Sequence, residues 1–400
     1  MPSYKILNFS SKNFRNIEFQ NIEFSSKLNL IIGKNGNGKT NLLEGIHLLG
    51  SKKSFRKNNT FPQFLKVNGE NSNIYILSII KEESSDRKIP FNCQIDSNGF
   101  NFSFDGKIVK KIPLIITMYI SPFDAHLFYL IPKVRRDFFD HYLGILNSEY
   151  KKILSKYFSL IKIRNKLISS SRAARSVKDI KGNFSNLTKQ INAVDKELSR
   201  YIPIIIRERE LFLSNLKTIY PQVAKDIFAN DVDINIILDS KFKSLSEEEV
   251  FKFMQDNLNE DIKLGITKYS VHRDNYLISF NGLNCEGFAS TGQQKLCYLS
   301  TLFAYIELFK NKFSIGPILL LDDVATELDK QKLNGLVKYL SNGNFQVFIT
   351  TTDENFENML FKETTLFNNT NACTSHQNLH FPIKKFKLEA GYMSLMTELV

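Results

Sequence analysis

The sequence predicts an α/β fold with a helical second lobe inserted into it, and three observations support this prediction. Near the N-terminus, the glycine-rich stretch "GKNGNGKT" separates an apolar run typical of a buried strand from a run with helical periodicity. Far downstream, another buried-strand run ends at two adjacent aspartates. Between them lies a basic region with helical spacing of its apolar residues. We therefore expect residues 1–132 and 231–400 to form one α/β head, and residues 133–230 to form a basic helical lobe.

The first element of the head is a strand, a glycine loop and a helix in direct succession. Leu28 to Ile32 is the expected strand, and Asn41 to Leu49 is the expected helix. The loop fits the pattern G-x-x-x-x-G-K-[ST], in which glycines let backbone N–H groups surround a phosphate chain at a helix N-terminus. We expect ATP as the ligand, Lys39 as the catalytic cation at its β- and γ-phosphates, and Thr40 as a ligand of Mg²⁺. The predicted nucleotide-binding residues are Gly33, Lys34, Asn35, Gly36, Asn37, Gly38, Lys39 and Thr40.

The second element supplies the carboxylates that a phosphate loop requires. Ile318 to Leu321 form a continuous apolar run typical of a strand covered on both faces, and Asp322 and Asp323 follow it. We expect Asp322 to bind Mg²⁺ together with Thr40, and Asp323 to polarise an attacking water as a catalytic residue. A helix cap is the alternative role for Asp323. The run "FQVFITTTD" at 345–353 predicts the neighbouring strand.

A third motif, "FASTGQQKLCYLSTLFAYIELF", precedes the second strand and opens a helix. Its residues Ser290, Gly292 and Gln293 resemble the signature motif of ABC-type ATPases, so the resemblance implies an ABC-type head. In that superfamily the signature caps the γ-phosphate held by the phosphate loop of a second copy, which implies an ATP-dependent homodimer. A serine hydroxyl at a helix N-terminus suits an anion, although an ordinary N-cap is the alternative role of Ser290.

The inserted lobe has the pattern of two helices. Leu146, Tyr150, Ile153, Tyr157 and Leu160 alternate by four and three, as do Leu187, Ile191, Val194, Leu198 and Tyr201. The stretch 169–183 is the expected connector, and Pro203 should end or kink the second helix. We expect two short helices, the first from about 133 to 168 and about 50 Å long at 1.5 Å per residue. Arg164 occupies a position on the first apolar seam where a core residue is due.

Charge is concentrated in the lobe. The chain carries a net charge of +12, and residues 133–225 alone hold 20 Lys or Arg against 8 Asp or Glu. This positive charge either forms a solvated helical surface or binds a phosphate-rich partner, which is the more specific interpretation. No base-reading motif is present, so we expect contacts to the DNA backbone without sequence specificity. The candidate DNA contacts are Arg135, Arg136, Lys151, Lys152, Arg164, Arg172 and Arg175.

Two of these arginines, and a second basic pair, have structural alternatives. Arg135 and Arg136 lie close to Asp137 and Asp140, so ion pairs at a helix start are an equal alternative to phosphate contacts. The basic pair "HR" at 272–273 either ends a strand or contacts DNA or nucleotide.

Along nearly its whole length the chain is similar to the RecF family of bacterial DNA-repair ATPases. Beyond the motifs above, the elements that carry this resemblance, in the family's order, are "NFRN" at 13–16, "KSFR" at 53–56, "SP" at 121–122, "PKVRRDFFD" at 132–140 and "HRD" at 272–274. The resemblance implies ATP-dependent dimerisation on duplex DNA next to single-stranded gaps. It implies action with RecR and RecO to load RecA in recombinational repair, replication and the SOS response. Slow hydrolysis is also implied, because Asp323 stands where many ABC ATPases carry glutamate and Thr352 where transporters carry histidine.

Several positions depart from the family pattern, and they bear on hydrolysis and on dimer contacts rather than on phosphate binding. The departures are Lys34 after the first glycine of the loop, Leu130 or Ile131 where a glycine is usual, Ser270 and Val271 where Gly-Pro is usual, Asn275 where an acid is usual, and Lys295 where an arginine is usual.

Composition and motifs argue against a membrane protein, a secreted protein and two other classes of ATPase. No apolar run approaches the roughly 20 residues of a membrane span, and the N-terminus lacks a secretory signal, so we expect a cytoplasmic protein without membrane contact. Cys93, Cys285, Cys297 and Cys373 are expected to be isolated reduced thiols, without disulfides or zinc. An antiphage ATPase with a nuclease module is disfavoured, because the residues after Asp353 contain no acidic metal-binding cluster. A transporter motor is disfavoured by the missing histidine and the large basic insertion.

Overall fold

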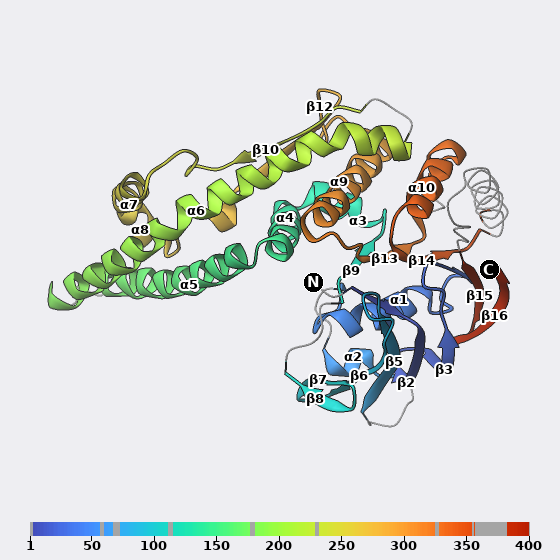
Figure 1. Ribbon diagram of the computed structural model, residues 1–400. Coiled ribbons are helices and arrows are strands. Elements are labelled where there is room, and N and C mark those ends of the chain that lie inside the picture. Colours follow the sequence, from blue (N-terminus) through green and yellow to red (C-terminus); the bar gives the residue numbers. More distant parts are fainter. Residues whose placement is uncertain are drawn as a thin grey trace. The chain divides into compact units, whose positions relative to one another are not determined.

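The computed structural model describes residues 3–56, 60–66, 73–110, 115–176, 181–228, 232–324, 328–353, 356 and 382–399 of the chain. The chain divides into two compact units, whose elements are labelled in Figure 1. The first unit, called the head below, comprises Met1–Asp124, Gln222–Asp231 and Leu302–Val400. The second, called the lobe below, comprises Ala125–Pro221 and Val232–Thr301.

This division differs from the boundaries expected from the sequence, which placed residues 231–301 with the head. Those residues belong to the lobe because they pack on its helices. Helix α8 (Leu258–Leu264) contacts α5 (Ser148–Ser176), and strand β11 (Asn275–Phe280) contacts α4 (Pro132–Leu146). The lobe thus contains the 3-stranded sheet of β10 (Ile234–Asp239), β11 and β12 (Leu283–Asn284), together with α7 (Glu247–Asp256).

The centre of the head is a six-stranded sheet in the order β16-β15-β4-β14-β13-β9. Its bounds are Tyr392–Leu399 for β16, Ile383–Glu389 for β15, Leu28–Ile32 for β4, Gln346–Thr351 for β14, Ile318–Asp322 for β13 and Thr117–Ile120 for β9. All neighbouring pairs are parallel except β15 with β16. Every residue of β4, β13 and β14 is buried, which explains the uninterrupted apolar runs of these strands. Parallel pairing brings the carboxyl ends of β4, β13 and β14 to one edge.

A second, antiparallel sheet of seven strands completes the head and was not predicted from the sequence. Its order is β3-β2-β5-β6-β7-β8, with β1 paired to β5. Its bounds are Tyr4–Ile6, Asn8–Phe14, Ile17–Glu23, Ile74–Glu82, Lys88–Asp96, Gly99–Phe104 and Lys107–Val109 for β1, β2, β3, β5, β6, β7 and β8. Side chains of β5 and β6 alternate between buried and exposed, and the buried ones share a core with α1 (Lys39–Gly50). The short helix α2 (Phe61–Phe64) adds Phe64 to that core.

The lobe helices are longer and differently divided than expected. The single helix expected at 133–168 is two helices, because Asn147 ends α4 and caps α5 with its side-chain oxygen, which accepts the N–H groups of Glu149 and Tyr150 at 3.1 Å each. Helix α5 continues to Ser176, so much of the expected connector is helical. Helix α3 (Asp124–Leu130) precedes α4, and η1 (Val271–Arg273) is a short 3₁₀ turn before β11.

The prediction of two short helices was wrong for the second one. Helix α6 (Lys181–Phe228) spans 48 residues, about 70 Å at 1.5 Å per residue, and does not end at Pro203. Figure 1 shows α5 and α6 side by side as long helices. A proline inside a helix costs about 3 kcal/mol, but the side chains flanking Pro203 are buried, and their burial outweighs this cost. These flanking residues are Leu198, Ile202, Ile205 and Ile206.

Two further predictions concern apolar segments and cysteines. Among the helices in the described ranges, none combines the length and apolarity needed to cross a bilayer. Cys93, Cys285 and Cys297 are buried free thiols, and Cys373 lies outside the described residues. The remaining elements are α9 (Thr291–Phe313), which opens with the third motif, and α10 (Lys330–Asn342).

Candidate nucleotide site

The glycine loop forms a preshaped pocket between the end of β4 and the start of α1. Gly38 is the residue before α1 and has φ 105°, a backbone conformation that favours glycine. A Cβ atom there would also lie 2.8 Å from the side chains of Asn16 and Ile17. Asn16 in turn donates to the carbonyl of Gly36 at 3.1 Å and accepts from Asn41 at 2.6 Å. Contacts with its neighbours in the chain therefore fix the conformation of the loop.

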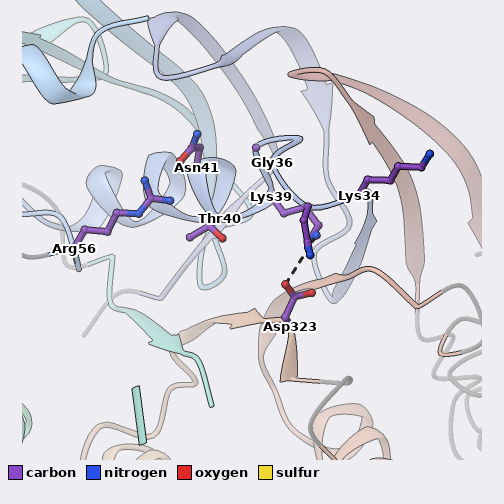
Figure 2. Close-up of a pocket in the computed structure, with 9 residues that line it drawn as sticks. Lys34, Gly36, Lys39, Thr40, Asn41, Arg56 and Asp323 are labelled. Carbon is purple, nitrogen blue, oxygen red and sulfur yellow. Dashed lines mark ion pairs between the residues drawn. The ribbon is translucent and has the colours of Figure 1, made fainter. Parts of the chain in front are cut away.

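The pocket has a volume of about 180 Å³ and is polar on every side. Figure 2 shows Lys39 directed across it at Asp323. Seven of the lining residues are the loop itself and the start of α1, as the sequence predicts, and the other two are Arg56 and Asp323. The complete set is Lys34, Asn35, Gly36, Gly38, Lys39, Thr40, Asn41, Arg56 and Asp323.

Lys39 is the buried cation of this pocket. It is only 5% exposed, and its ammonium group donates to the carbonyl oxygen of Gly33 at 2.9 Å. The same nitrogen lies 3.9 Å from a carboxylate oxygen of Asp323. Backbone N–H groups at a helix N-terminus beside a buried ammonium form a site for a phosphate chain.

Asp322, at the end of β13, is surrounded by three hydroxyl groups. Thr40 and Tyr119 donate to its Oδ2 at 2.8 and 2.9 Å, and Thr350 donates to its Oδ1 at 2.6 Å. The strand register explains this arrangement, because Asp322 pairs with Thr350 across the parallel β13–β14 ladder. A carboxylate and a threonine hydroxyl in contact are the hard oxygen donors that Mg²⁺ prefers. Thr40 and Asp322 therefore fit the predicted metal site.

Tyr119 was missed by the sequence reasoning. Burial and the charge of Asp322 raise the pKa of its hydroxyl, so it remains a protonated donor. The stretch "TMYI" at 117–120 could have indicated this residue. A short strand parallel to β13 ends at the same edge of the sheet, close to Asp322.

Asp323 follows in a left-handed backbone conformation, with φ 50°. Its N–H donates to the carbonyl and hydroxyl oxygens of Thr350, each at 3.2 Å. Burial raises the pKa of its carboxyl, Lys39 opposes that rise and Asp322 adds to it. The N-cap of α10 is Asp329, which accepts the N–H of Lys332 at 3.0 Å.

Two arginines from motifs that the sequence named separately meet on one buried carboxylate. Glu44, on α1, is fully buried. Arg15 binds it with two nitrogen atoms at 2.9 Å each, Arg56 approaches it at 3.3 Å, and the hydroxyl of Ser54 also donates to it. Because Arg56 lines the pocket, this cluster fixes the pocket wall to α1.

The signature residues lie in the lobe and begin α9. Ser290 and Gln293 form a reciprocal cap. The Ser290 N–H donates to Oε1 of Gln293 at 2.8 Å, and the Gln293 N–H donates to the Ser290 hydroxyl at 3.3 Å. Ser290 and Gly292 are exposed, and Gln293 is partly exposed. The N-cap role is therefore present, and the helix start remains open to an anion.

The structure removes two arginines from the candidate DNA contacts because both are fully buried. Arg135 donates to the carbonyl of Phe128 at 3.1 Å and forms an ion pair with Glu286. Arg164 forms ion pairs with Asp195 and Asp261, each at 2.6 Å. Both guanidinium groups are used inside the lobe, so the functional interpretation of these two positions is wrong.

Four of the remaining candidates are at least partly accessible. Lys151, Lys152 and Arg172 are exposed, and Arg136 is half-buried. Lys152 pairs with Glu149 at 2.6 Å. Arg136 and Arg172 each donate to a backbone carbonyl, at 2.7 and 3.1 Å. The side chain of Arg175 lies outside the described residues.

The "HRD" segment forms η1 over a buried arginine that the sequence did not single out. Arg209, 1% exposed, donates to the carbonyl of Val271 and to the carboxylate of Asp274, both at 2.9 Å. Burial raises the pKa of Asp274 to about 7, although Arg209 opposes the rise. Burial and the neighbouring guanidinium groups lower the pKa of His272 to about 4. Arg273 is exposed at the end of this turn.

Comparisons with known proteins agree with this architecture. A family model described as "RecF/RecN/SMC N terminal domain" matches residues 5–375. The DNA replication and repair protein RecF of Thermoanaerobacter pseudethanolicus is 30% identical over 338 residues, which cover 82% of this chain and 89% of that protein. A solved structure titled as the recombination mediator protein RecF-ATP in the RecFOR pathway has a TM-score of 0.76 at 24% identity, covering 99% of this chain and 98% of that chain.

A more distant solved structure, the Smc head domain of Pyrococcus furiosus, has a TM-score of 0.53 at 13% identity, covering 99% of this chain and 96% of that chain. These likenesses confirm the predicted fold class, an α/β ABC-type ATPase head with a helical second lobe. The matching family model and the similarity to curated relatives confirm the resemblance stated from the motifs. The chain belongs to the RecF family of DNA replication and repair proteins.

Proposed function

We propose that this chain is an ATP-dependent, sequence-independent DNA-binding protein of recombinational repair, which acts as a homodimer on duplex DNA beside single-stranded gaps. The observation that carries the proposal is the joining of the phosphate loop to the β13 carboxylate by the 2.8 Å contact between Thr40 and Asp322. Membership of the RecF family supports the repair role, and the relative solved as RecF-ATP supports ATP as the nucleotide.

In the proposed nucleotide site, the loop N–H groups bind the phosphate chain. Lys39 leaves the carbonyl of Gly33 and pairs with the β- and γ-phosphates. Thr40 and Asp322 are the residues that would hold Mg²⁺, which neutralises charge on the phosphate oxygens when bound. Asp323 orients a water for attack, and its raised pKa makes it a better proton acceptor than an ordinary aspartate. We propose slow hydrolysis, because an aspartate reaches less far than the glutamate that many ABC ATPases use.

The dimer in this proposal is completed by the signature of the second copy. The start of α9 offers a hydroxyl, free space and the positive end of a 23-residue helix. Ser290, Gly292 and Gln293 of one copy would therefore cap the γ-phosphate bound by the loop of its partner. This arrangement links ATP occupancy to dimerisation.

The DNA surface in this proposal is the accessible part of the basic lobe. Lys151, Lys152 and Arg172 lie on α5, and Arg136 lies on α4. Such side chains neutralise phosphates irrespective of base sequence, so affinity falls as salt rises. The RecFOR pathway named for the solved relative supports RecR and RecO as partners, with RecA as the protein loaded, in replication and the SOS response. A cytoplasmic location belongs to the same proposal.

Fluorescence anisotropy of labelled DNA tests the proposal directly. Gapped, fully duplex and single-stranded DNA are each titrated with protein in the presence of ATP, ADP or no nucleotide, over a salt series. We expect binding that requires ATP, weakens with salt and prefers duplex-containing DNA. If DNA binding were the same with and without ATP, or absent, DNA binding by the basic lobe would not depend on the phosphate loop, and the proposal would be refuted.

A further inference from the structure

Strand β9 brings an aromatic hydroxyl to the metal carboxylate. Tyr119 lies on this edge strand of the six-stranded sheet, opposite Leu320 of β13. Its hydroxyl donates to Oδ2 of Asp322 at 2.9 Å, the oxygen that also accepts from Thr40 at 2.8 Å. Both hydroxyls therefore donate to the same carboxylate oxygen. The direction of the Asp322 carboxylate therefore depends on Tyr119 as well as on the phosphate loop.

The ring of Tyr119 is itself held in place by stacking. Phe55 lies parallel to it, with ring centroids 3.7 Å apart and an interplanar angle of 6°. His47, on α1, meets the Phe55 ring at 5.5 Å and 61°, and its Nδ1 lies 2.7 Å from the hydroxyl of Thr117. Stacking on one side and the strand on the other leave the ring little rotational freedom.

The residues beside Phe55 join this stack to the pocket. Ser54 and Arg56 both contact the buried carboxylate of Glu44, and Arg56 lines the phosphate pocket. The segment 54–56 therefore touches α1, the pocket wall and the ring that orients Asp322. The ring of Tyr119 is thus held by a segment that also supplies Arg56 to the pocket.

We propose that Tyr119 is a positioning residue for the metal site, and that its hydroxyl, held by Phe55, orients Asp322 for Mg²⁺. This inference rests on the proposed binding of ATP with Mg²⁺. Groups that hydrogen-bond to metal ligands fix ligand orientation, and their loss costs about 10- to 100-fold in metal affinity. The Thr40 and Thr350 hydroxyls remain when the Tyr119 hydroxyl is removed, so we expect the lower end of this range.

The experiment measures ATP affinity as a function of Mg²⁺ for the full chain. A fluorescent ATP analogue carrying an N-methylanthraniloyl group is bound first in excess chelator and then across a Mg²⁺ titration. Tyr119→Phe keeps the stacked ring and removes only the hydroxyl. We expect the Mg²⁺ concentration at half-maximal effect to rise about tenfold, with the metal-free affinity unchanged.

Two further variants separate orientation from general damage. Tyr75→Phe removes a hydroxyl from a surface tyrosine of β5 in the same unit, and it should match the unmodified protein. Phe55→Leu keeps the Tyr119 hydroxyl but loses the parallel ring, and it should shift the Mg²⁺ midpoint in the same direction by less.

The outcomes distinguish this inference from the proposed function. An unchanged Mg²⁺ midpoint in Tyr119→Phe would overturn the inference, as would an equal loss of affinity with and without Mg²⁺, because a damaged pocket affects both. Failure of the unmodified protein to bind the analogue with Mg²⁺ would refute the proposed nucleotide site itself, and the inference with it.

Discussion

Replacing Arg164 tests whether this residue is structural or binds DNA. Its guanidinium connects α5 to α6 through Asp195 and α5 to α8 through Asp261, with N–O distances of 2.6 Å to each. The side chains of Arg164 and Asp195 are 0% exposed, and that of Asp261 is 3% exposed. In Arg164→Ala, two carboxylates would face each other in the lobe interior without the cation between them. The donors left to them would include neutral N–H groups, that of Gln255 at 3.0 Å from Asp195 and that of Lys268 at 2.8 Å from Asp261.

The loss of stability expected for Arg164→Ala follows from the burial of the ion pairs. Removing one partner of a buried ion pair costs about 3–5 kcal/mol, because the remaining charge is desolvated and unpaired. A typical domain is stable by only about 5–15 kcal/mol, so the loss is a large share of the stability of the lobe. Arg164→Lys keeps the charge but cannot make the fork of contacts, and it should lose less. The loss should shrink in acid, because burial already raises the pKa of Asp195, and protonation removes the unpaired charge.

Urea unfolding followed by circular dichroism measures the loss, and hydrogen exchange of amides in α5, α6 and α8 locates it. Arg172→Ala is the matched control, since Arg172 is an exposed arginine of the same helix. Surface substitutions of that kind stay within about 0.5 kcal/mol. If Arg164→Ala cost no more than Arg172→Ala, the structural role derived from the buried pairs would be refuted.

Three further predictions concern the site, the dimer and pH. Lys39→Ala removes the counter-charge of the γ-phosphate, so ATP should no longer induce dimers in light scattering, and an unchanged dimer fraction would contradict this. Ser290→Ala should retain ATP binding by calorimetry and impair dimerisation, whereas equal loss of both would mean that Ser290 acts on its own chain's nucleotide. The pKa of His272 is lowered from 6.5 to about 4, so only the unfolded chain binds this proton in that window, and stability falls as the pH drops from 6.5 towards 4. Compared with the unmodified protein, His272→Gln should lose less stability in that window, by at most about 1.4 kcal/mol per pH unit, and parallel curves from urea unfolding would argue against it.

The parts of the site that the sequence predicted are those encoded in short stretches. A glycine loop, a lysine and a threonine are contiguous from 33 to 40, and an apolar run followed by Asp322 is unambiguous for a buried strand. The proximity of the loop to Asp322 could be inferred, because a parallel sheet brings the carboxyl ends of its strands to one edge. The helix-capping geometry of Ser290 was readable for the same reason, since both partners lie within one turn.

The parts that the sequence did not predict depend on partners distant in the chain. Arg164 was noticed as out of place on an apolar seam, but Asp261 lies 97 residues away and nothing local connects them. Glu44 has the spacing of an ordinary helix charge, and only folding places two arginines on it. Pro203 shows the opposite case, because the local rule predicted an end or a kink and the helix does not end there, where its neighbours are buried.

The contact between Lys39 and the carbonyl of Gly33 has a consequence for the proposed nucleotide binding. The carbonyl of Gly33 accepts from this ammonium at 2.9 Å, so the loop itself supplies the buried cation with an oxygen partner. In the proposed site, a phosphate oxygen would replace an oxygen partner that Lys39 already has. The gain from this contact would therefore be only the difference between the two partners, and the affinity for the nucleotide would depend mainly on the other groups of the loop.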